Sequence, residues 1–279
     1  LIGGFGPTAG MFPMHGWRPT AQPVAPAPAS AVLSGIITKS GVLAITRVIY
    51  YAAGADVIRG TWVQYTWMTL ALVTVFMGSM MAYKEQVLKK RLAYSTVSQV
   101  SYILFGLSIL NAEGLVGALS HFVFHSVVKN CLFLAAGVVI FQTGKKTVGE
   151  LKGLGKQMPV TMWCFTLVSI TLVGIPPTSG FVSKWYLALG SLKAGTGAGA
   201  WIGPVVLLLS AMLTAGYLLP ISIQSFFPGT EAEEGVSCSR EPGFLMLIPM
   251  LLFTAAAVLF GMFPDTFMGF LQTIAAAVL

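Results

Sequence analysis

Apolar stretches of about twenty residues, separated by short polar loops, recur along the whole chain. A helix of that length crosses the roughly 30 Å hydrocarbon core of a bilayer. Of the 279 residues, 56% are hydrophobic and only 9% are charged, which excludes an ordinary water-soluble domain. Because the stretches lack the apolar/polar alternation of barrel strands, the sequence predicts an all-α polytopic membrane protein.

The spacing of these stretches predicts about eight transmembrane helices, two of them broken by Gly and Pro. We expect the spans at about 1–15, 29–51, 63–83, 92–110, 114–142, 159–192, 201–227 and 243–277.

Three ionisable side chains share one face of the stretch at 114–142, within HFVFHSVVKN. His121, His125 and Lys129 stand four residues apart, so a helix places them one above the other. A charge at the bilayer centre costs about 2.5–3.5 kcal/mol on insertion scales, so this face must point to the protein interior or to water. Ionisable groups at such depth indicate function. The alternative is that they only hydrogen-bond neighbouring helices.

Two further lysines lie within apolar spans. Lys39 stands about ten residues from either end of the span at 29–51, and snorkelling to the membrane surface is its structural alternative. Lys184 follows the Gly/Pro break in the span at 159–192. With the two histidines, which titrate near neutral pH, these lysines form a row of groups that can take up and release protons.

Two Gly/Pro-rich segments predict broken helices: GFGPTAGMF at 4–12 and GIPPTSGFV at 174–182. Freed backbone groups cannot face lipid, so both breaks should line a cavity. The segments align without gaps, which indicates paired discontinuous helices in two units of inverted topology. We expect Thr178 or Ser179 to satisfy freed backbone groups in the second break. The residues assigned to the breaks are Pro7, Thr8, Pro176, Pro177 and Thr178.

Most loop Lys and Arg residues follow the first, third, fifth and seventh spans. The positive-inside rule therefore places these loops in the cytoplasm and the C-terminus on the outer side. Because the net charge of +7 reflects this topology, nucleic acid is not expected as a partner. The chain lacks an initiator Met and opens within an apolar segment, so we expect it to be a fragment of a longer subunit.

No metal or cofactor site is expected in this chain. His121 and His125 have the i, i+4 spacing of zinc ligands, but no Cys or acidic third ligand lies nearby on that helix. The three cysteines are widely spaced without a C-x-x-C pair, which argues against an iron–sulfur cluster and a disulfide framework.

Four ordered motifs resemble the antiporter-like subunits shared by respiratory complex I, membrane-bound hydrogenases and multisubunit sodium/proton antiporters. They are AGMFPMHGWRPTAQPVAPAPASAVLSGIITKSG, KKRLAYSTVSQVSYI, HFVFHSVVKNCLFLAAG and GIPPTSGFVSKW. The resemblance covers nearly the whole chain and implies the last eight helices of such a subunit. It implies two helices of an incomplete first unit at 1–52, a complete five-helix unit at 63–227 and a C-terminal helix at 243–279.

Members of that family move protons, or exchange them for sodium, along a central row of lysines and histidines. The resemblance implies a non-redox, ion-translocating subunit of a redox-driven complex I-like or hydrogenase-like pump in a prokaryotic cell membrane. Its partners would be other membrane subunits and peripheral subunits that carry iron–sulfur, flavin or nickel–iron centres. The positions that match the family's row or its conserved polar sites are Lys39, Lys89, His121, His125, Lys129 and Lys184.

Two alternatives stay open: a subunit of a secondary sodium/proton antiporter, and a structural subunit of the membrane arm that does not conduct. The second is motivated by Thr8, which stands where the family usually has a Lys in its first broken helix. A hydroxyl group cannot hold a proton as an ammonium group does.

Overall fold

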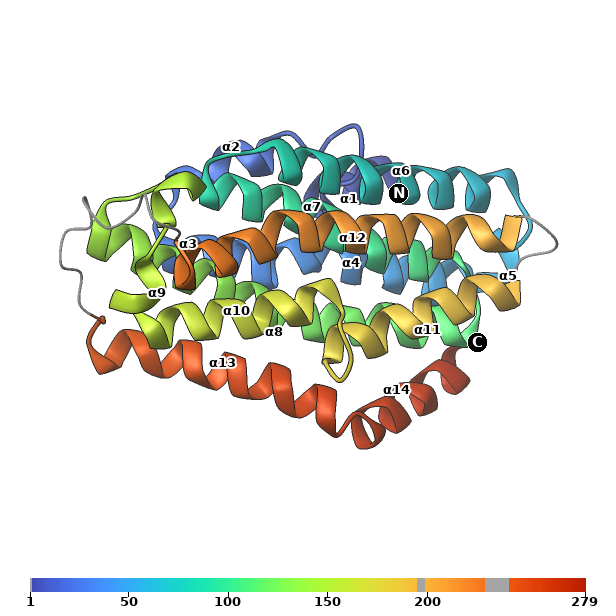
Figure 1. The fold of residues 1–279 in the computed structure, drawn as a ribbon. Coiled ribbons are helices and arrows are strands. Elements are labelled where there is room, and N and C mark those ends of the chain that lie inside the picture. Colours follow the sequence, from blue (N-terminus) through green and yellow to red (C-terminus); the bar gives the residue numbers. More distant parts are fainter. Residues whose placement is uncertain (1, 195–198, 229–240) are drawn as a thin grey trace.

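The computed structural model describes residues 2–194, 199–228 and 241–279. Within these ranges the regular elements are helices, which run roughly along one direction as an elongated bundle (Figure 1). The predicted all-α class is therefore confirmed. Cys238 and Arg240, which belong to the loop before the last predicted span, lie outside the described residues.

Five helices in the described ranges are long and apolar enough to cross a bilayer, and each falls on a predicted span. They are Ala27–Ala53, α6 (Trp62–Lys84), α8 (Ala112–Thr143), Ala200–Phe226 within α12 (Gly199–Phe226), and α13 (Phe244–Met262). The first of them consists of α3 (Ala27–Val32), the π-helical segment η1 (Leu33–Ile37), α4 (Thr38–Thr46) and the π-helical segment η2 (Arg47–Ala53).

Two helices form the centre of the bundle. α7 (Leu88–Ser108) is buried over nearly its whole length, between α6 and α8. α8 contacts α7, α10, α11, α13 and α3, so its side chains meet protein on several sides. The side chain of Asn111 caps α8 by accepting a hydrogen bond from Gly114 N–H at 2.8 Å. Gly144 ends the helix in the left-handed conformation at φ 72°.

The second predicted break is confirmed. α10 (Pro159–Val173) ends at Gly174, and α11 (Ser179–Ala194) begins after a non-helical segment that contains Pro176, Pro177 and Thr178. The hydroxyl group of Thr178 donates to Ile175 C=O at 2.7 Å, so Thr178 is the predicted side chain that satisfies a freed carbonyl.

The first break lies later in the chain than predicted. α1 (Ile2–Ala9) contains Pro7 and Thr8, and α2 begins only at Trp17 and ends at Val24. The reason is that Gly10, at φ 76°, ends α1, as Gly174, at φ 88°, ends α10. The equivalent segments are therefore GMFPMHG at 10–16 and GIPPTSG at 174–180, and the ungapped sequence alignment was out of register.

The last predicted span, at 243–277, is wrong as a single helix. The chain forms α13, turns at Phe263 and Pro264, and continues as α14 (Asp265–Val278), which is inclined to α13 (Figure 1). Pro264 explains the turn, because proline disfavours helical geometry in the residue before it. α14 then packs against α8.

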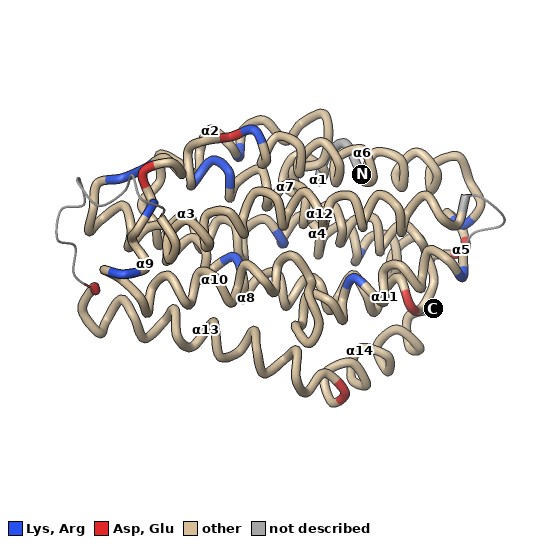
Figure 2. The backbone as a smooth tube through the Cα atoms, in the orientation of Figure 1, with Lys and Arg blue, Asp and Glu red and all other residues tan. Residues whose placement is uncertain are grey.

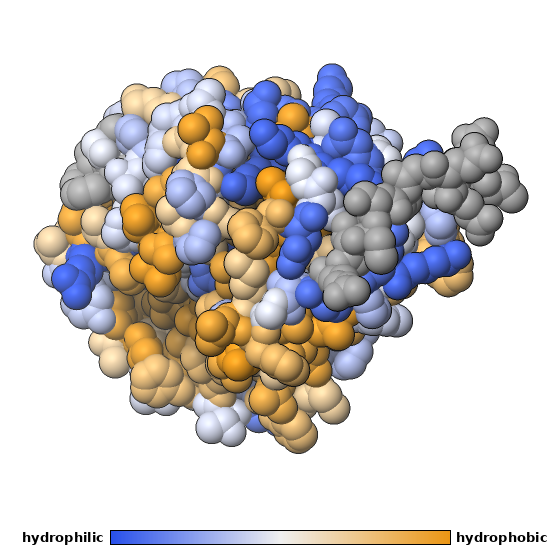
Figure 3. All heavy atoms as spheres, turned by 90° about the vertical axis from the view of Figure 1, so that its left-hand side faces the viewer, coloured by the Kyte–Doolittle hydropathy of each residue, from blue (hydrophilic) through white to orange (hydrophobic). Residues whose placement is uncertain are grey.

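Two basic loops lie together at one end of the bundle. Leu88 N–H donates to Lys146 C=O, and Val148 N–H donates to Gln86 C=O, both at 2.9 Å. This agrees with the prediction that the loops after the third and fifth spans share one side of the membrane. Lys and Arg gather at the ends of the bundle, with only a few along its middle (Figure 2), and this end has a hydrophilic area (Figure 3).

Glu85 joins the same end of the bundle through an ion pair with Lys90 at 2.9 Å. Partial burial raises the pKa of Glu85, but hydrogen bonds from Lys90 and from the backbone N–H groups of Val87 and Gln86 outweigh it. The net effect is a pKa below the usual value for a glutamate. Glu85 therefore stays ionised at neutral pH and offsets part of the positive charge of this end.

Candidate functional site

The two histidines and the lysine on α8 face the interior of the bundle, as predicted. The exposed fraction of the side chain is 2% for His121, 1% for His125 and 0% for Lys129. The two imidazole rings are stacked, with centroids 5.8 Å apart and 14° between their planes. Four-residue spacing on one helix face produces this arrangement.

His121 is held by side chains of two other helices, α7 and α11. Its Nδ1 lies 2.9 Å from Ser183 Oγ on α11, and its Nε2 lies 3.1 Å from Gln99 Oε1 on α7. The ring also stacks on Tyr102, with centroids 5.4 Å apart. Gln99 and Ser183 had not been singled out in the sequence, because an isolated Gln or Ser in an apolar span carries no spacing signal. Both ring nitrogens of His121 therefore have fixed partners.

His125, one turn further along α8, has the opposite environment. Neither of its ring nitrogens has a hydrogen-bond partner among the described residues, although the side chain is buried. A cavity of about 10 Å³ adjoins it, lined by residues that include Val128, Thr171 and Gly180. This is about the smallest volume that holds one water molecule. Because buried polar groups are nearly always hydrogen-bonded, His125 is the member of the row that most needs a water partner.

Lys129 and Lys39 continue the row beyond His125. Lys129 Nζ donates to Leu92 C=O at 3.1 Å. Lys39 is buried, and its Nζ donates to Gly35 C=O at 2.8 Å and to Ser34 C=O at 3.4 Å, both within the π-helical segment η1. None of the ion pairs among the described residues involves either lysine. Both ammonium groups are thus bound only by neutral carbonyl groups.

The electrostatic neighbours give the order of the row. Among the groups on α8, the charge of Lys184 acts on His121 alone. The charge of Lys39 acts on Lys129, on His125 and, less strongly than that of Lys184, on His121. The order is therefore Lys184, His121, His125, and then Lys129 with Lys39.

Lys184 lies at the second break and is partly buried. Its Nζ donates to Leu172 C=O and Val173 C=O, each at 2.7 Å. These are the last carbonyl groups of α10, which have no intrahelical partner and carry the negative end of the helix dipole. The ammonium group also lies 5.3 Å from the centroid of the Tyr102 ring. Lys184 therefore stabilises the break besides belonging to the row.

This double role gives a prediction for Lys184. We expect Lys184→Met to destabilise the purified protein in detergent, because two buried carbonyl groups lose their donors at about 1–3 kcal/mol each. Lys184→Arg should restore most of the thermal stability but not ion translocation, because a guanidinium group does not release its proton. A Lys184→Met protein as stable as the wild type would contradict the capping role.

Arg18, which carries no distinguishing signal in the sequence, binds the end of α1 at the first break as Lys184 binds the end of α10 at the second. Its side chain is 0% exposed, and Nη2 reaches back to donate to Thr8 C=O at the end of α1. Its Nε and Nη1 have no partner within the described part of the chain. The first span was expected to end at about residue 15, which would place Arg18 in the loop after it. A cation thus caps the first half-helix at both breaks: Arg18 at one and Lys184 at the other.

Lys89 does not join the central row. It lies at the start of α7, and its Nζ donates to Ala25 C=O, at the C-terminal end of α2, at 2.9 Å. Its electrostatic neighbour is Lys146 of the adjacent basic loop. The structure therefore gives Lys89 a helix-capping position at the basic end of the bundle.

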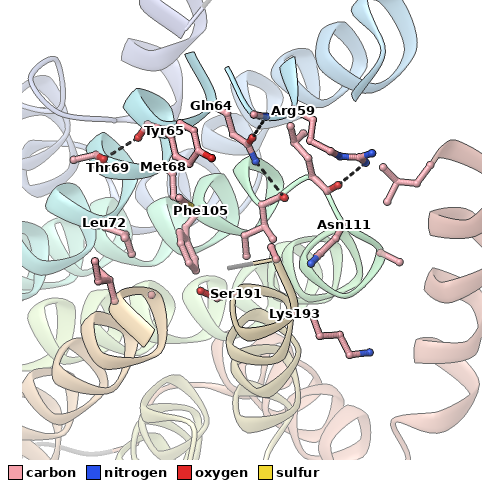
Figure 4. A pocket seen from close by; sticks show the side chains of 18 residues that line it. Arg59, Gln64, Tyr65, Met68, Thr69, Leu72, Phe105, Asn111, Ser191 and Lys193 are labelled. Carbon is pink, nitrogen blue, oxygen red and sulfur yellow. Dashed lines mark hydrogen bonds between the residues drawn. The ribbon is translucent and has the colours of Figure 1, made fainter. Parts of the chain in front are cut away.

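A larger cavity, of about 730 Å³, lies at the opposite end of the bundle (Figure 4). Several of its polar lining groups are paired within the protein. The Gln64 side chain accepts from Gly60 N–H at 2.8 Å and donates to Ser108 C=O at 2.9 Å, while Lys193 pairs with Glu113. Arg59, also in the lining, pairs with Asp56 at 2.6 Å. This cavity shares no lining residue with the Lys and His row.

A membrane bundle with two cation-capped helix breaks and a buried row of lysines and histidines between them defines the class of antiporter-like membrane subunits. Residues 1–228 match the family "NADH:quinone oxidoreductase/Mrp antiporter, TM". The chain belongs to this family.

Individual relatives agree with this assignment. The chain is 37% identical over 276 residues to NADH-quinone oxidoreductase subunit N of Desulforudis audaxviator, which covers 95% of this chain and 54% of that protein. It is 32% identical over 277 residues to hydrogenase-4 component B of Escherichia coli, covering 92% of this chain and 40% of that one. A chain of the membrane-bound sulfane sulfur reductase, an archaeal respiratory membrane complex, has a TM-score of 0.87 at 27% identity, covering 99% and 54%. The chain thus spans about half the length of the relatives that it matches.

Proposed function

We propose that this chain is an ion-translocating membrane subunit of a redox-driven complex, and that it moves protons along the row described above. The observation that carries the proposal is a set of titratable side chains inside the bundle, with no carboxylate paired to any of them among the described residues. They are Lys184, which is partly buried, and the buried His121, His125, Lys129 and Lys39. Burying several such groups is costly and serves packing poorly. Family membership supports the same function.

The order of the row suggests how it conducts. A proton that arrives at one lysine repels a proton on its neighbour, because like charges in a buried setting disfavour each other. Lys39 and Lys129 are placed to act on each other in this way, with His125 beside them. The unpartnered His125 next to a cavity of one-water size can pass protons between the lysine pair and His121.

Partners and location follow from the relatives. The relatives named above are subunits or components of larger enzymes, so we place this chain among other membrane subunits, with the redox centres in peripheral partner subunits. No cofactor is assigned to the chain itself. We place it in a prokaryotic cell membrane with the basic end in the cytoplasm and the C-terminus outside. Residues 63–227 would form a complete five-helix unit, and residues 1–52 the end of the preceding one.

Two alternatives are distinguishable. A secondary sodium/proton antiporter is supported by the family itself, whose name includes the Mrp antiporters. A structural, non-conducting subunit was suggested by Thr8 in place of a lysine, but Arg18 supplies a buried cation at that same break. A guanidinium group does not release its proton, so Arg18 supplies the charge at this break but not a proton carrier, and the structural alternative is retained.

The test is proton movement by the isolated complex in sealed proteoliposomes, followed with a pH-sensitive dye. We expect acidification of the lumen when the electron donor of the complex is added in sodium-free buffer. Proton movement that occurs only with an imposed sodium gradient would replace the pump by the antiporter. An intact complex that moves protons under neither condition would support the structural alternative.

A further inference from the structure

We propose that His121 passes protons by exchanging its tautomer, and that Gln99 and Ser183 are positioning residues that reverse their hydrogen bonds with it. This inference rests on the proposed function and deepens it. It starts from the contrast between the two histidines: His125 has no partner among the described residues, while both nitrogens of His121 face side chains able to donate and to accept.

One set of hydrogen bonds follows directly from the atoms in contact. The oxygen Oε1 of Gln99 only accepts, so Nε2 of His121, 3.1 Å away, carries the proton and donates it. In a neutral imidazole the other nitrogen is then an acceptor. Nδ1 accepts from the hydroxyl group of Ser183 at 2.9 Å. In this state the amide nitrogen of Gln99 is buried without a partner among the described residues.

The opposite set of hydrogen bonds is available without moving a helix. A half-turn of the Gln99 amide brings its nitrogen to the place of its oxygen, so that it donates to Nε2 of His121. Nδ1 then carries the proton and donates it to Ser183 Oγ. The hydroxyl group of Ser183 has another acceptor ready, because Gly180 C=O lies 3.1 Å away. Both tautomers of His121 are therefore fully hydrogen-bonded.

The proton balance of one transfer is simple. A proton that arrives from the α11 side forms an N–H bond at Nδ1, which gives an imidazolium ion that donates to both Ser183 and Gln99. The N–H bond at Nε2 then breaks, and its proton passes to a ring nitrogen of His125 through water in the small cavity that both histidines line. The ring ends neutral in the other tautomer, and the Gln99 amide and the Ser183 hydroxyl turn to match it.

This mechanism restricts which side chains can work at position 99. The group must be able to donate and to accept, as an amide or an imidazole can. An ionised carboxylate only accepts and would hold the proton on Nε2. The thioether of a methionine has a similar length, but it cannot donate a hydrogen bond and accepts one only weakly. A purely structural role would instead tolerate any side chain that fills the space.

The experiment compares Gln99→Glu, Gln99→Met and Gln99→His in the assembled complex. We expect the Glu and Met variants to assemble but to lose about a hundredfold in proton translocation, the lower bound for a positioned acid–base group. Gln99→His should retain most of the rate. The matched control is Gln64→Met, because the amide of this buried glutamine binds only backbone groups, those of Gly60, Ser108 and Ile109. It should translocate normally per assembled complex.

A second measurement separates positioning from packing. Infrared difference spectra of the complex with isotope-labelled histidine, compared with a His121→Asn sample, should contain bands of both His121 tautomers in the wild type and of one in Gln99→Glu. Normal translocation by Gln99→Glu, or a single tautomer in the wild type, would overturn the inference. If Lys129→Ala still pumps, the proposed function fails. If Lys129→Ala is inactive while Gln99→Glu is normal, only the tautomer exchange fails.

Discussion

We expect Lys129→Ala to reduce ion translocation by the assembled complex to the background level, and Thr8→Ala to leave it near the wild-type rate. Lys129 is fully buried between His125 and Lys39, so alanine removes a proton carrier from the middle of the row. Thr8 contributes its backbone carbonyl group to the first break, where Arg18 binds it. Alanine keeps that carbonyl group.

The measurement is proton uptake into membrane vesicles that contain wild-type or variant complex, normalised to the amount of assembled complex. Normalisation matters because the loss of a large buried side chain also leaves a gap, which costs about 2–5 kcal/mol in comparable cores. Lys129→Ala complexes that assemble and pump at the normal rate would mean that the row does not conduct. The structural alternative would then replace the pump.

The second large effect is expected from Gly180→Ala. Gly180 lies in the first turn of α11, directly against the end of α10, and an added Cβ atom would lie 1.8 Å from Thr171 C=O. The clash is between the backbone of α11 at Gly180 and the backbone of α10 at Thr171, so it can be relieved only by separating the two half-helices. Overpacking costs about 1–3 kcal/mol where side chains can adjust, and we expect more here. The variant should fold poorly and assemble in small amounts.

Gly269→Ala on α14 is the matched control, because nothing lies within 4 Å of a Cβ atom at that position. Its thermal stability in detergent and its assembled amount should equal those of the wild type. A Gly180→Ala protein with the same stability as this control would show that the half-helices are not as closely packed as described.

The positions of the spans and of the second break could be predicted because their signals are local. Chain length in an apolar run and the pair Pro176–Pro177 act within one segment of sequence. The last span was misjudged although its signal was also local, since Pro264 interrupts an otherwise apolar run. The first break was misplaced because the ungapped alignment matched identical residues and could not include the positive φ that Gly10 shares with Gly174.

In the candidate site, too, features set within one helix could be predicted and contacts between helices could not. The face shared by His121, His125 and Lys129 follows from helical spacing alone, so it could be predicted. The contacts of Gln99 with His121 and of Arg18 with Thr8 join residues of different elements, and no periodicity within one segment reveals them. The proximity of Lys39 to Lys129 likewise depends on how α3 and η1, which precede Lys39, pack against α8.

Lys184 couples its own protonation state to the strength of the contact between α10 and α11. Its Nζ is a member of the proposed proton row and also links α11 to the end of α10, through Leu172 C=O and Val173 C=O. A neutral amine still has two N–H groups for these carbonyl groups, but hydrogen bonds from a charged donor are roughly twice as strong. Loss of a proton from Lys184 would therefore weaken the hydrogen bonds between α11 and the end of α10, and its return would strengthen them. The strength of the link between the two half-helices would thus depend on whether Lys184 carries its proton.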